Sequence, residues 1–329
     1  MGKTIIFNNK PKIISTYSVA GPKESLSYIN DYFDCKIDDD FFQEKTFEKA
    51  ETKMLYRCIL GIFEKNKLND KDIDVILSGD LLNQITASSF SIRNFDCSYL
   101  GIYNACATFA ESIIIGSMGV DGGYLKNCIC ATSSHFSSAE RQYRYPLELG
   151  STRPPLSQWT VTGAGSVLID RSEIGININS ATIGKIVDFG IKDANNMGSA
   201  MAPSAVDTLV SHFKTTGTKP RDYDLIVTGD LGTFGSRIFK DLCWERGYDV
   251  ENQHIDCGEI IYNIKEEEFQ GGSGAGCSSL VFSSYIYRNI LEGKLKRVLL
   301  ICTGALLSST TTLQGESIPG ISHLVDIGG

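Results

Sequence analysis

The sequence lacks the features that mark several classes of protein. It has no run of about 18 apolar residues, so we expect no helix that spans a bilayer. Residues 1–12 contain no apolar stretch typical of a secretory leader, so we expect no signal peptide. The 10 cysteines are dispersed, and no two have the C-x-x-C spacing of a zinc site. The sequence therefore predicts a reduced chain without a metal site, which would meet a membrane only peripherally.

The sequence also lacks an excess of positive charge. Asp and Glu number 39 against 31 Lys and Arg, which gives a net charge of −8. A nucleic-acid binder needs a basic face, so we expect no nucleic-acid partner. No Walker-type phosphate loop is present, so nucleotide hydrolysis is not expected either. A local pocket for a small anion is still compatible with this balance.

The chain contains an internal repeat. Residues 72–81 read DIDVILSGDL and residues 222–231 read DYDLIVTGDL, with 6 of 10 positions identical. Each run is typical of a short buried strand that ends at Gly-Asp. Apolar residues three and four apart precede each run, which predicts a helix before each strand.

A second repeat relates residues 106–132 to residues 277–303. Both segments have a cysteine, an apolar helix, a glycine-containing break and a strand, although only five positions are identical. Helices that are apolar nearly all round should be buried. The alternation of strands and helices therefore predicts an α/β protein, built as a duplicated α/β/α/β/α sandwich with halves at 1–187 and 188–329. Residues 160–170 and 175–186 are predicted to be paired strands that end the first half.

Cys106 is the first chemical clue. It opens an apolar helix, and the N-terminus of a helix offers free N–H groups and a partial positive charge. Both favour a thiolate or a bound anion, although a small buried cysteine is the ordinary structural explanation. Cys277 has the same position in the second repeat. We expect it to be structural, because a duplicated fold usually works at one of its two copies.

These features together resemble the thiolase and β-ketoacyl-ACP synthase superfamily. The resemblance rests on the duplication, on Cys106, and on the strand sequence GAGSV at 163–167. Members use the cysteine as an acyl acceptor, helped by His, Asn or a second Cys. Here Ser273 stands where thiolases have a catalytic His, residues 228–232 have no His, and no Cys follows Cys302. The resemblance therefore implies a thiolase-like fold with a damaged catalytic set.

One branch of this superfamily is more similar. Residues 133–162, which include SSHFSSAERQ and QWTVTG, resemble the stage V sporulation AD family of spore-forming bacteria, as do DCGE at 256–259 and GGSG at 271–274. The resemblance implies binding of dipicolinic acid (pyridine-2,6-dicarboxylate), as the free acid or its calcium chelate. It also implies membership of the SpoVA assembly, which moves this ligand across the spore inner membrane in sporulation and germination. Other SpoVA membrane proteins would be partners that hold the chain at the forespore inner membrane, and the superfamily suggests a homodimer.

Dipicolinate is a planar aromatic dianion, so its site needs donors for two carboxylates and a flat apolar slot. Arg141, Arg144 or Arg153 would supply a bidentate fork. Trp159, Phe136 or Tyr143 would line the slot. We expect no cofactor and no catalytic residue. The candidate ligand-binding residues are Asn104, Cys106, His135, Arg141, Gln142, Arg144, Trp159, Thr160, Thr162, Asp256, Ser273 and Cys277.

Other interpretations stay open at this point. Arg141 follows Glu140 and is as well explained by a surface ion pair, and Trp159 by a place in the core. His135 is either a structural residue or a base beside Cys106. In the second case the chain would be an acyl-transfer enzyme with Cys106 as its nucleophile. A scaffold with a vestigial pocket is the third possibility.

Overall fold

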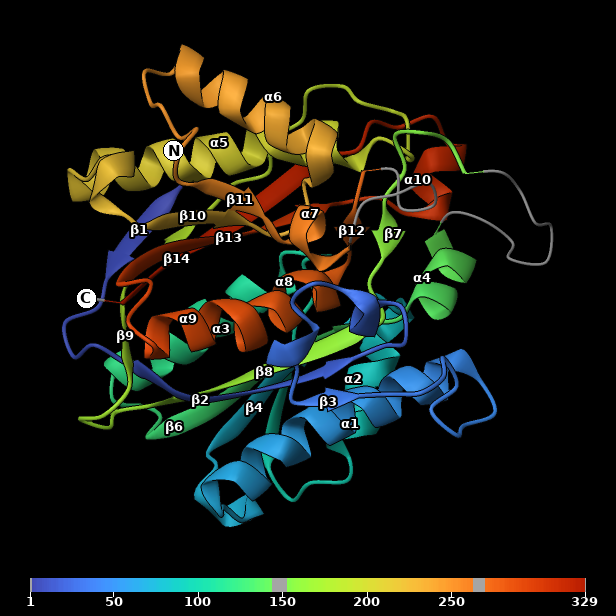
Figure 1. Ribbon diagram of the computed structural model, residues 1–329, viewed down its shortest axis with the longest axis vertical. Helices are drawn as coiled ribbons and strands as arrows, with labels where there is room; N and C mark the ends of the chain where they lie inside the picture. Colours follow the sequence, from blue (N-terminus) through green and yellow to red (C-terminus); the bar gives the residue numbers. More distant parts are fainter. Residues whose placement is uncertain (1, 144–152, 263–269, 329) are drawn as a thin grey trace.

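The computed structural model describes residues 2–143, 153–262 and 270–328 (Figure 1). Their strands follow the order β11-β10-β13-β14-β9-β2-β8-β6-β4-β5, with β1 beside β9 and β3 beside β2. Pairing between β2 and β9 is confined to Lys12 and Ile13, so the order falls into two sheets joined at one corner. The strands of the first sheet are β2 (Lys12–Ala20), β3 (Cys35–Lys36), β4 (Val75–Gly79), β5 (Ser98–Gly101), β6 (Asn127–Ser134) and β8 (Gly163–Asp170). Those of the second are β1 (Lys3–Ile6), β9 (Ile176–Ile183), β10 (Leu225–Thr228), β11 (His254–Asp256), β13 (Arg297–Ala305) and β14 (Gly320–Gly328).

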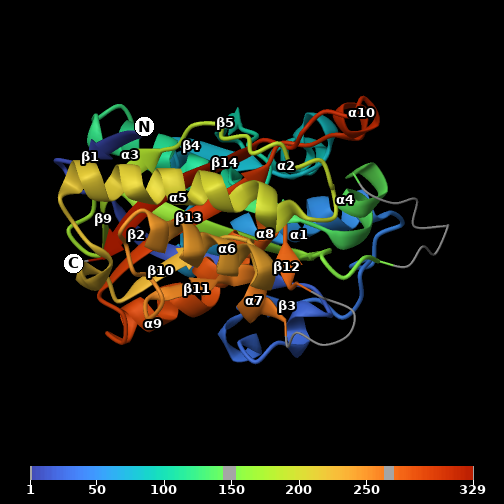
Figure 2. The same cartoon turned by 90° about the horizontal axis from the view of Figure 1, so that it is seen from above.

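Helices occupy three layers around the two sheets. α3 (Thr108–Asp121) and α8 (Ala275–Val281) lie in the middle, where α3 packs on strands of both sheets and α8 packs on α3. α1 (Phe47–Asn66) and α2 (Thr86–Ile92) cover the first sheet, whereas α5 (Met197–Thr216) and α6 (Gly232–Glu245) lie on the side of the second (Figures 1 and 2). The predicted α/β/α/β/α sandwich is confirmed.

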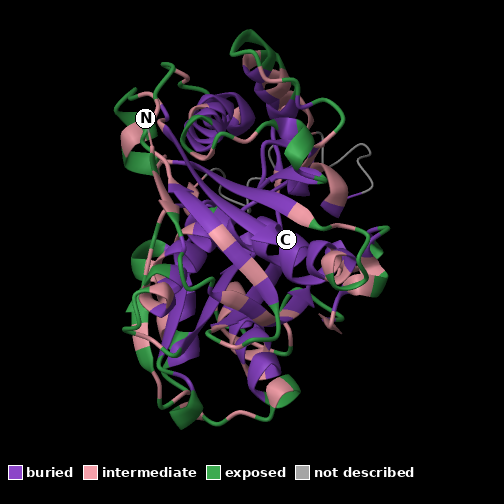
Figure 3. Ribbon diagram, turned by 90° about the vertical axis from the view of Figure 1, so that its left-hand side faces the viewer, coloured by how far each residue is buried: buried purple, intermediate pink, exposed green. Residues whose placement is uncertain are grey.

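The middle layer is buried because its helices have almost no polar face. Phe109 of α3 and Phe282, which follows α8, are both fully buried, with ring centroids 5.9 Å apart. After α8 the helical segment continues through a π-helical turn (Phe282–Ile286) and α9 (Tyr287–Leu291). Figure 3 shows the sheets and the middle helices as buried, with exposed residues confined to the periphery.

The decapeptide repeat forms equivalent strands. β4 lies between the parallel strands β5 and β6, and β10 lies between the parallel strands β11 and β13. The predicted helix before each strand is also present, as α1 and α5. Short-range periodicity was sufficient here because each strand is flanked along the chain by its own covering helix.

One predicted pairing is wrong. The strands within 160–170 and 175–186 do not pair with each other, because β2 lies between β8 and β9. β2 pairs with β8 along Lys12–Ala20, and β9 pairs instead with β14 and β1. Such contacts join segments far apart in sequence, and local periodicity carries no information about them. The division at 187 stays a prediction, with β9 already in the second sheet.

Most of the following short elements lie toward one end of the sandwich (Figure 1). They are α4 (Phe136–Tyr143), β7 (Trp159–Thr160), α7 (Cys257–Ile261), β12 (Gly272–Ser273) and α10 (Ser309–Leu313). None of the helices in the described ranges is long and apolar enough to cross a membrane.

Candidate functional site

Cys106 stands on a tight turn just before α3. Ala105 has a φ of 51°, a left-handed conformation that costs an L-residue about 1–2 kcal/mol. Thr108 stabilises the turn, because its Oγ1 accepts the Asn104 N–H at 2.9 Å and donates to the Ala105 carbonyl at 2.7 Å. The turn leaves Cys106 at the mouth of α3 with 7% of its surface exposed.

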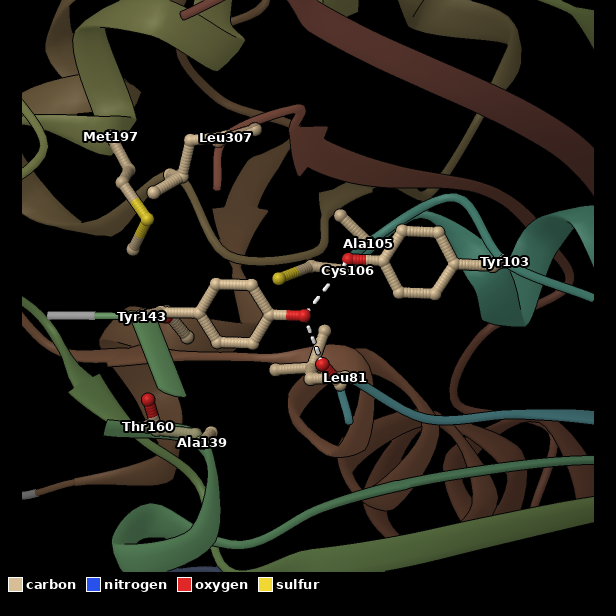
Figure 4. A pocket seen from close by; sticks show the side chains of 11 residues that line it. Leu81, Tyr103, Ala105, Cys106, Ala139, Tyr143, Thr160, Met197 and Leu307 are labelled. Atoms are coloured by element: carbon tan, nitrogen blue, oxygen red, sulfur yellow. Dashed lines mark hydrogen bonds between the residues drawn. The ribbon is translucent and has the colours of Figure 1, made fainter. Parts of the chain in front are cut away.

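A cavity that is partly open to solvent lies against Cys106 (Figure 4). Cys106 comes from the turn before α3, Thr160 from β7, Ser273 from β12 and Tyr143 from α4. None of the lining residues that the structure describes carries a fixed charge. They are Leu81, Tyr103, Ala105, Cys106, Ala139, Tyr143, Thr160, Met197, Ser273, Ala305 and Leu307.

A two-stranded parallel pairing brings Thr160 and Ser273 together. β7 and β12 pair with Ser273 opposite Thr160, and the Val161 N–H donates to the Ser273 carbonyl at 2.8 Å. Gly274 follows with a φ of 114°, and a Cβ there would come within 2.6 Å of Ser134 Oγ. Asp230 fixes this turn, since its Oδ2 accepts the Gly274 N–H at 3.0 Å. Three of the predicted site residues, Cys106, Thr160 and Ser273, thus line the same cavity.

Cys277 occupies a different environment from Cys106. It lies within α8 and is fully buried, and its thiol donates to the Gly229 carbonyl at 3.4 Å. Burial raises the pKa of the Cys277 thiol well above its usual value. Of the two repeated cysteines, only Cys106 lines the cavity.

His135 does not reach the cavity. Its Nδ1 accepts the Ser137 N–H at 3.2 Å, so the proton is on Nε2, which donates to the Asp40 carbonyl at 2.8 Å. Burial lowers the pKa of His135 and keeps the ring neutral. With both nitrogens engaged, the geometry gives no support to His135 as a base for Cys106. His135 therefore lies outside the lining of this cavity, and its role as a ligand-binding residue stays a prediction.

The predicted cationic fork is not among the described cavity-lining residues. Arg141 pairs with Glu48 at 3.6 Å on the surface, as in its structural interpretation. Gln142 accepts the Asn83 N–H at 3.0 Å and lies outside the lining. Arg144 lies outside the described residues.

Arg153 approaches the wall of the cavity through Glu140. Its Nη1 is 3.5 Å from Oε2 of Glu140, a fully buried carboxylate. Glu140 Oε1 accepts the hydroxyl of Thr160 at 2.9 Å. The Arg153 guanidinium therefore lies behind the wall of the cavity, because the Glu140 carboxylate stands between it and Thr160.

Trp159 and Thr162 support the site from behind. Trp159 stacks on Phe136 with ring centroids 3.9 Å apart, and Lys23 Nζ lies 4.0 Å above the Trp159 ring. Thr162 Oγ1 accepts the Phe136 N–H at 3.1 Å, and the Thr162 N–H donates to Glu24 at 2.9 Å. Both residues lie outside the lining of this cavity and pack where β7 and α4 meet, so their role as ligand-binding residues stays a prediction.

Asn104 and Asp256 also lie outside the lining. The Asn104 amide pairs with Nε2 of His323 at 2.9 Å, next to the Cys106 turn. Asp256 is fully buried and accepts the Thr228 hydroxyl at 2.6 Å and the Leu231 N–H at 2.8 Å. Burial raises the pKa of Asp256 to about 7. Asn104 thus joins the Cys106 turn to His323, whereas Asp256 holds the backbone at Leu231.

Several lining residues escaped the sequence analysis. Tyr103 stands three residues before Cys106, and that proximity was its available signal. Leu81 ends the repeated decapeptide, whereas Met197 and Leu307 come from the second half through packing that no local pattern reports. Within the described ranges, no group of three or more His, Cys, Asp or Glu is arranged to hold a metal ion.

Comparison with known proteins decides the family. The model of the family described as Stage V sporulation protein AD (SpoVAD) matches residues 1–328. Stage V sporulation protein AD of Bacillus subtilis (strain 168) is 43% identical over 321 residues, which cover 98% of this chain and 95% of that protein. The chain belongs to the SpoVAD family. This membership supports a role in sporulation linked to SpoVA.

Solved structures related to this SpoVAD family member are thiolase-like. The 3-oxoacyl-[acyl-carrier-protein] synthase III of Aquifex aeolicus VF5 is 14% identical, with 97% of this chain and 100% of that chain covered and a TM-score of 0.55. A cerulenin complex of Xanthomonas campestris OleA is 13% identical, with 99% and 98% covered and a TM-score of 0.61. At such identities the similarity shows the fold alone, and the thiolase-like expectation is confirmed.

Proposed function

We propose that this SpoVAD family member binds dipicolinic acid in the Cys106 cavity and catalyses no reaction on it. It would serve the SpoVA system, which moves dipicolinate across the spore inner membrane in sporulation and germination. The observation that carries the proposal is the cavity itself. In a thiolase-like fold it retains the cysteine at the helix mouth, but its described lining offers no general base.

The cavity suits a flat ring with acceptor groups at its edge. Leu81, Met197 and Leu307 provide apolar surface for the ring. The N-terminus of α3 contributes a partial positive charge beside Cys106, which favours a carboxylate. Hydroxyl groups of Tyr103 and Tyr143 add neutral donors, since both residues line the cavity.

A catalytic role would need a proton acceptor for Cys106. His323 is connected to the Cys106 turn by the hydrogen bond between its Nε2 and the Asn104 amide, and its Nδ1 accepts the Gly184 N–H at 3.2 Å. Burial lowers the pKa of His323 to about 4, so its ring is neutral and structurally engaged. A general base typically contributes about 10²–10⁴-fold to a rate. Losing one favours binding over acyl transfer.

The proposal extends to where the protein acts and with what. We expect a forespore protein held at the inner membrane by other SpoVA membrane proteins, with free dipicolinate or its calcium chelate as ligand. We also expect a homodimer. The edge strand β5 supports this expectation, since Ser98, Leu100 and Gly101 along it are exposed.

Calorimetric titration with dipicolinate tests the proposal, with benzene-1,4-dicarboxylate as the geometric control. We expect one site of about micromolar affinity, near −8 kcal/mol, for dipicolinate and no binding of the control. Cys106→Ala should weaken binding about tenfold or more, because Cys106 lines the cavity. Cys277→Ala is the matched control and should keep the affinity, because Cys277 is buried elsewhere in α8.

Absence of heat with dipicolinate at concentrations that reveal a micromolar site would refute the binding proposal. Incubation with acyl-CoA, followed by mass spectrometry of the Cys106 peptide, tests the acyl-transfer alternative. A stable acyl-Cys106 adduct would favour that alternative. Failure of both experiments, together with capture of SpoVA membrane proteins, would favour a scaffold.

A further inference from the structure

Tyr103 and Tyr143 separate the Cys106 cavity from a second hollow. An outer groove is formed by residues 82–85, 101–103 and 306–308 together with Tyr143. Tyr103, Tyr143 and Leu307 line both the groove and the cavity. These three side chains are therefore the partition between the two spaces.

A directed chain of hydrogen bonds fixes the partition in place. The Tyr143 hydroxyl donates its single proton to the Leu81 carbonyl. Tyr103 Oη and Tyr143 Oη are 3.1 Å apart, so the proton in that bond must come from Tyr103. Figure 4 shows the Tyr143 hydroxyl between the other two oxygens, with Cys106 behind it. The chain runs from Tyr103 through Tyr143 to Leu81.

The groove has a rim of strained backbone. Gln84 and Ile85 have φ values of 56° and 47°, two consecutive left-handed residues, of which one is β-branched. Such conformations cost about 1–3 kcal/mol each and cluster at ligand clamps and switches. The Leu81 carbonyl that receives the Tyr143 proton lies just before this segment.

We propose that the Tyr103–Tyr143 pair is a latch on the Cys106 cavity, and that in the open state both hydroxyls donate to a carboxylate of an aromatic dicarboxylate ligand. The second half of this proposal rests on the proposed function, whereas the first does not. Opening breaks the bond to the Leu81 carbonyl and joins the cavity to the groove.

A ligand carboxylate is a better acceptor for the tyrosine hydroxyls than the Leu81 carbonyl that it would replace. A carboxylate forms charge-assisted hydrogen bonds roughly twice as strong as those to a neutral carbonyl. Burial raises the pKa of both tyrosines, so both hydroxyls keep their protons and act as donors. No described lining residue carries a fixed positive charge, so neutral donors must carry much of the recognition.

Alkylation of Cys106 measures the latch without any ligand. The purified protein is treated with iodoacetamide, and modification of Cys106 and Cys277 is followed by peptide mass spectrometry. Tyr143→Phe should speed Cys106 labelling about threefold to tenfold, the effect of losing a neutral hydrogen bond. Tyr103→Phe should have a smaller effect, and the double variant should match Tyr143→Phe, because the Tyr103 bond acts through Tyr143. Tyr124→Phe, at a side chain 89% exposed, is the matched control and should change nothing.

Cys277 reports global unfolding in the same samples, because it is fully buried. A rise at Cys106 alone supports the latch. Unchanged Cys106 labelling in both tyrosine variants, or an equal rise at Cys277, overturns it.

The ligand half is tested by titrating the same variants with dipicolinate. Tyr103→Phe and Tyr143→Phe should each weaken binding about tenfold, as expected for a lost hydrogen bond to a charged group. Unchanged affinity in both variants overturns the receptor role even if the latch stands. Absence of binding by the wild type would refute the proposed function instead, and the labelling result would still decide the latch.

Discussion

Glu51 is a carboxylic acid buried completely under α4. Its two oxygens accept the Ser133 hydroxyl at 3.1 Å and the Ser138 hydroxyl at 2.7 Å. Burial, reinforced by the neighbouring carboxylate of Asp80, raises the pKa of Glu51 to about 8. The folded state therefore holds a proton that the unfolded chain releases near pH 4.5. This contribution to stability is full below about pH 4.5 and is lost as the pH rises to about 8.

Glu51→Gln removes this titration while keeping the shape of the side chain. The stability of the variant relative to the wild type should increase by about 4 kcal/mol between pH 5 and pH 8.5. Urea denaturation at the two pH values measures the difference. Glu64→Gln, at an exposed residue paired with Arg57, is the control and should show no such trend. A pH-independent difference for Glu51→Gln would mean that Glu51 is ionised in the fold.

At the scale of elements, the two copies of the Gly-Asp-Leu motif make different contacts. Asp80 accepts the N–H groups of Leu82 at 2.8 Å and Ser88 at 2.7 Å, and so shapes the segment that leads into α2. Asp230 instead accepts the Thr303 hydroxyl at 2.6 Å and the Gly274 N–H. Near-identical decapeptides form equivalent strands, but the partners at their ends come from different parts of the fold.

The turn between β12 and α8 should be intolerant of a side chain. Gly274→Ala places a Cβ within 2.6 Å of Ser134 Oγ in addition to requiring a left-handed alanine. Gly217→Ala is the matched control, because its φ is also positive, at 73°, but nothing lies within 4 Å of the added Cβ. We expect Gly274→Ala to cost about 2 kcal/mol more free energy of unfolding than Gly217→Ala. Urea denaturation measures both, and equal costs would contradict the steric argument.

At the scale of the whole molecule, the two outermost strands of the described sheet path differ. All three residues of β11 are buried or half-buried, whereas β5 exposes Ser98, Leu100 and Gly101. An unpaired strand edge of this kind is a ready template for a second chain. The proposed homodimer would remove this edge by pairing β5 with its copy.

Leu100→Asp tests that arrangement. Sedimentation velocity should find the wild type as a dimer and the variant as a monomer, because a buried charge at the interface is unfavourable. Ile174→Asp is the control, since Ile174 is also exposed but lies in the turn after β8. A wild-type monomer, or a dimer that survives Leu100→Asp, would contradict pairing through β5.

Much of the architecture could be predicted from the sequence, because it depends on local pattern. The repeated strands and the apolar α3 follow from periodicity within short windows. The β8–β9 pairing failed because β2, far away in sequence, lies between them. Among the candidate residues, Cys106 was found through its helix and Thr160 and Ser273 through the family resemblance. Tyr103 and Leu307 required the assembled fold.

The sequence by itself determined the duplicated sandwich and the cysteine before α3. These are properties of residue type and spacing, which short segments carry with them. Only the tertiary structure decided that Cys106 rather than Cys277 lines a cavity, that His135 faces Asp40, and that Tyr103 and Tyr143 meet at the wall of that cavity. Each of these outcomes depends on contacts between segments far apart in sequence, and the packing of the whole chain determines those contacts.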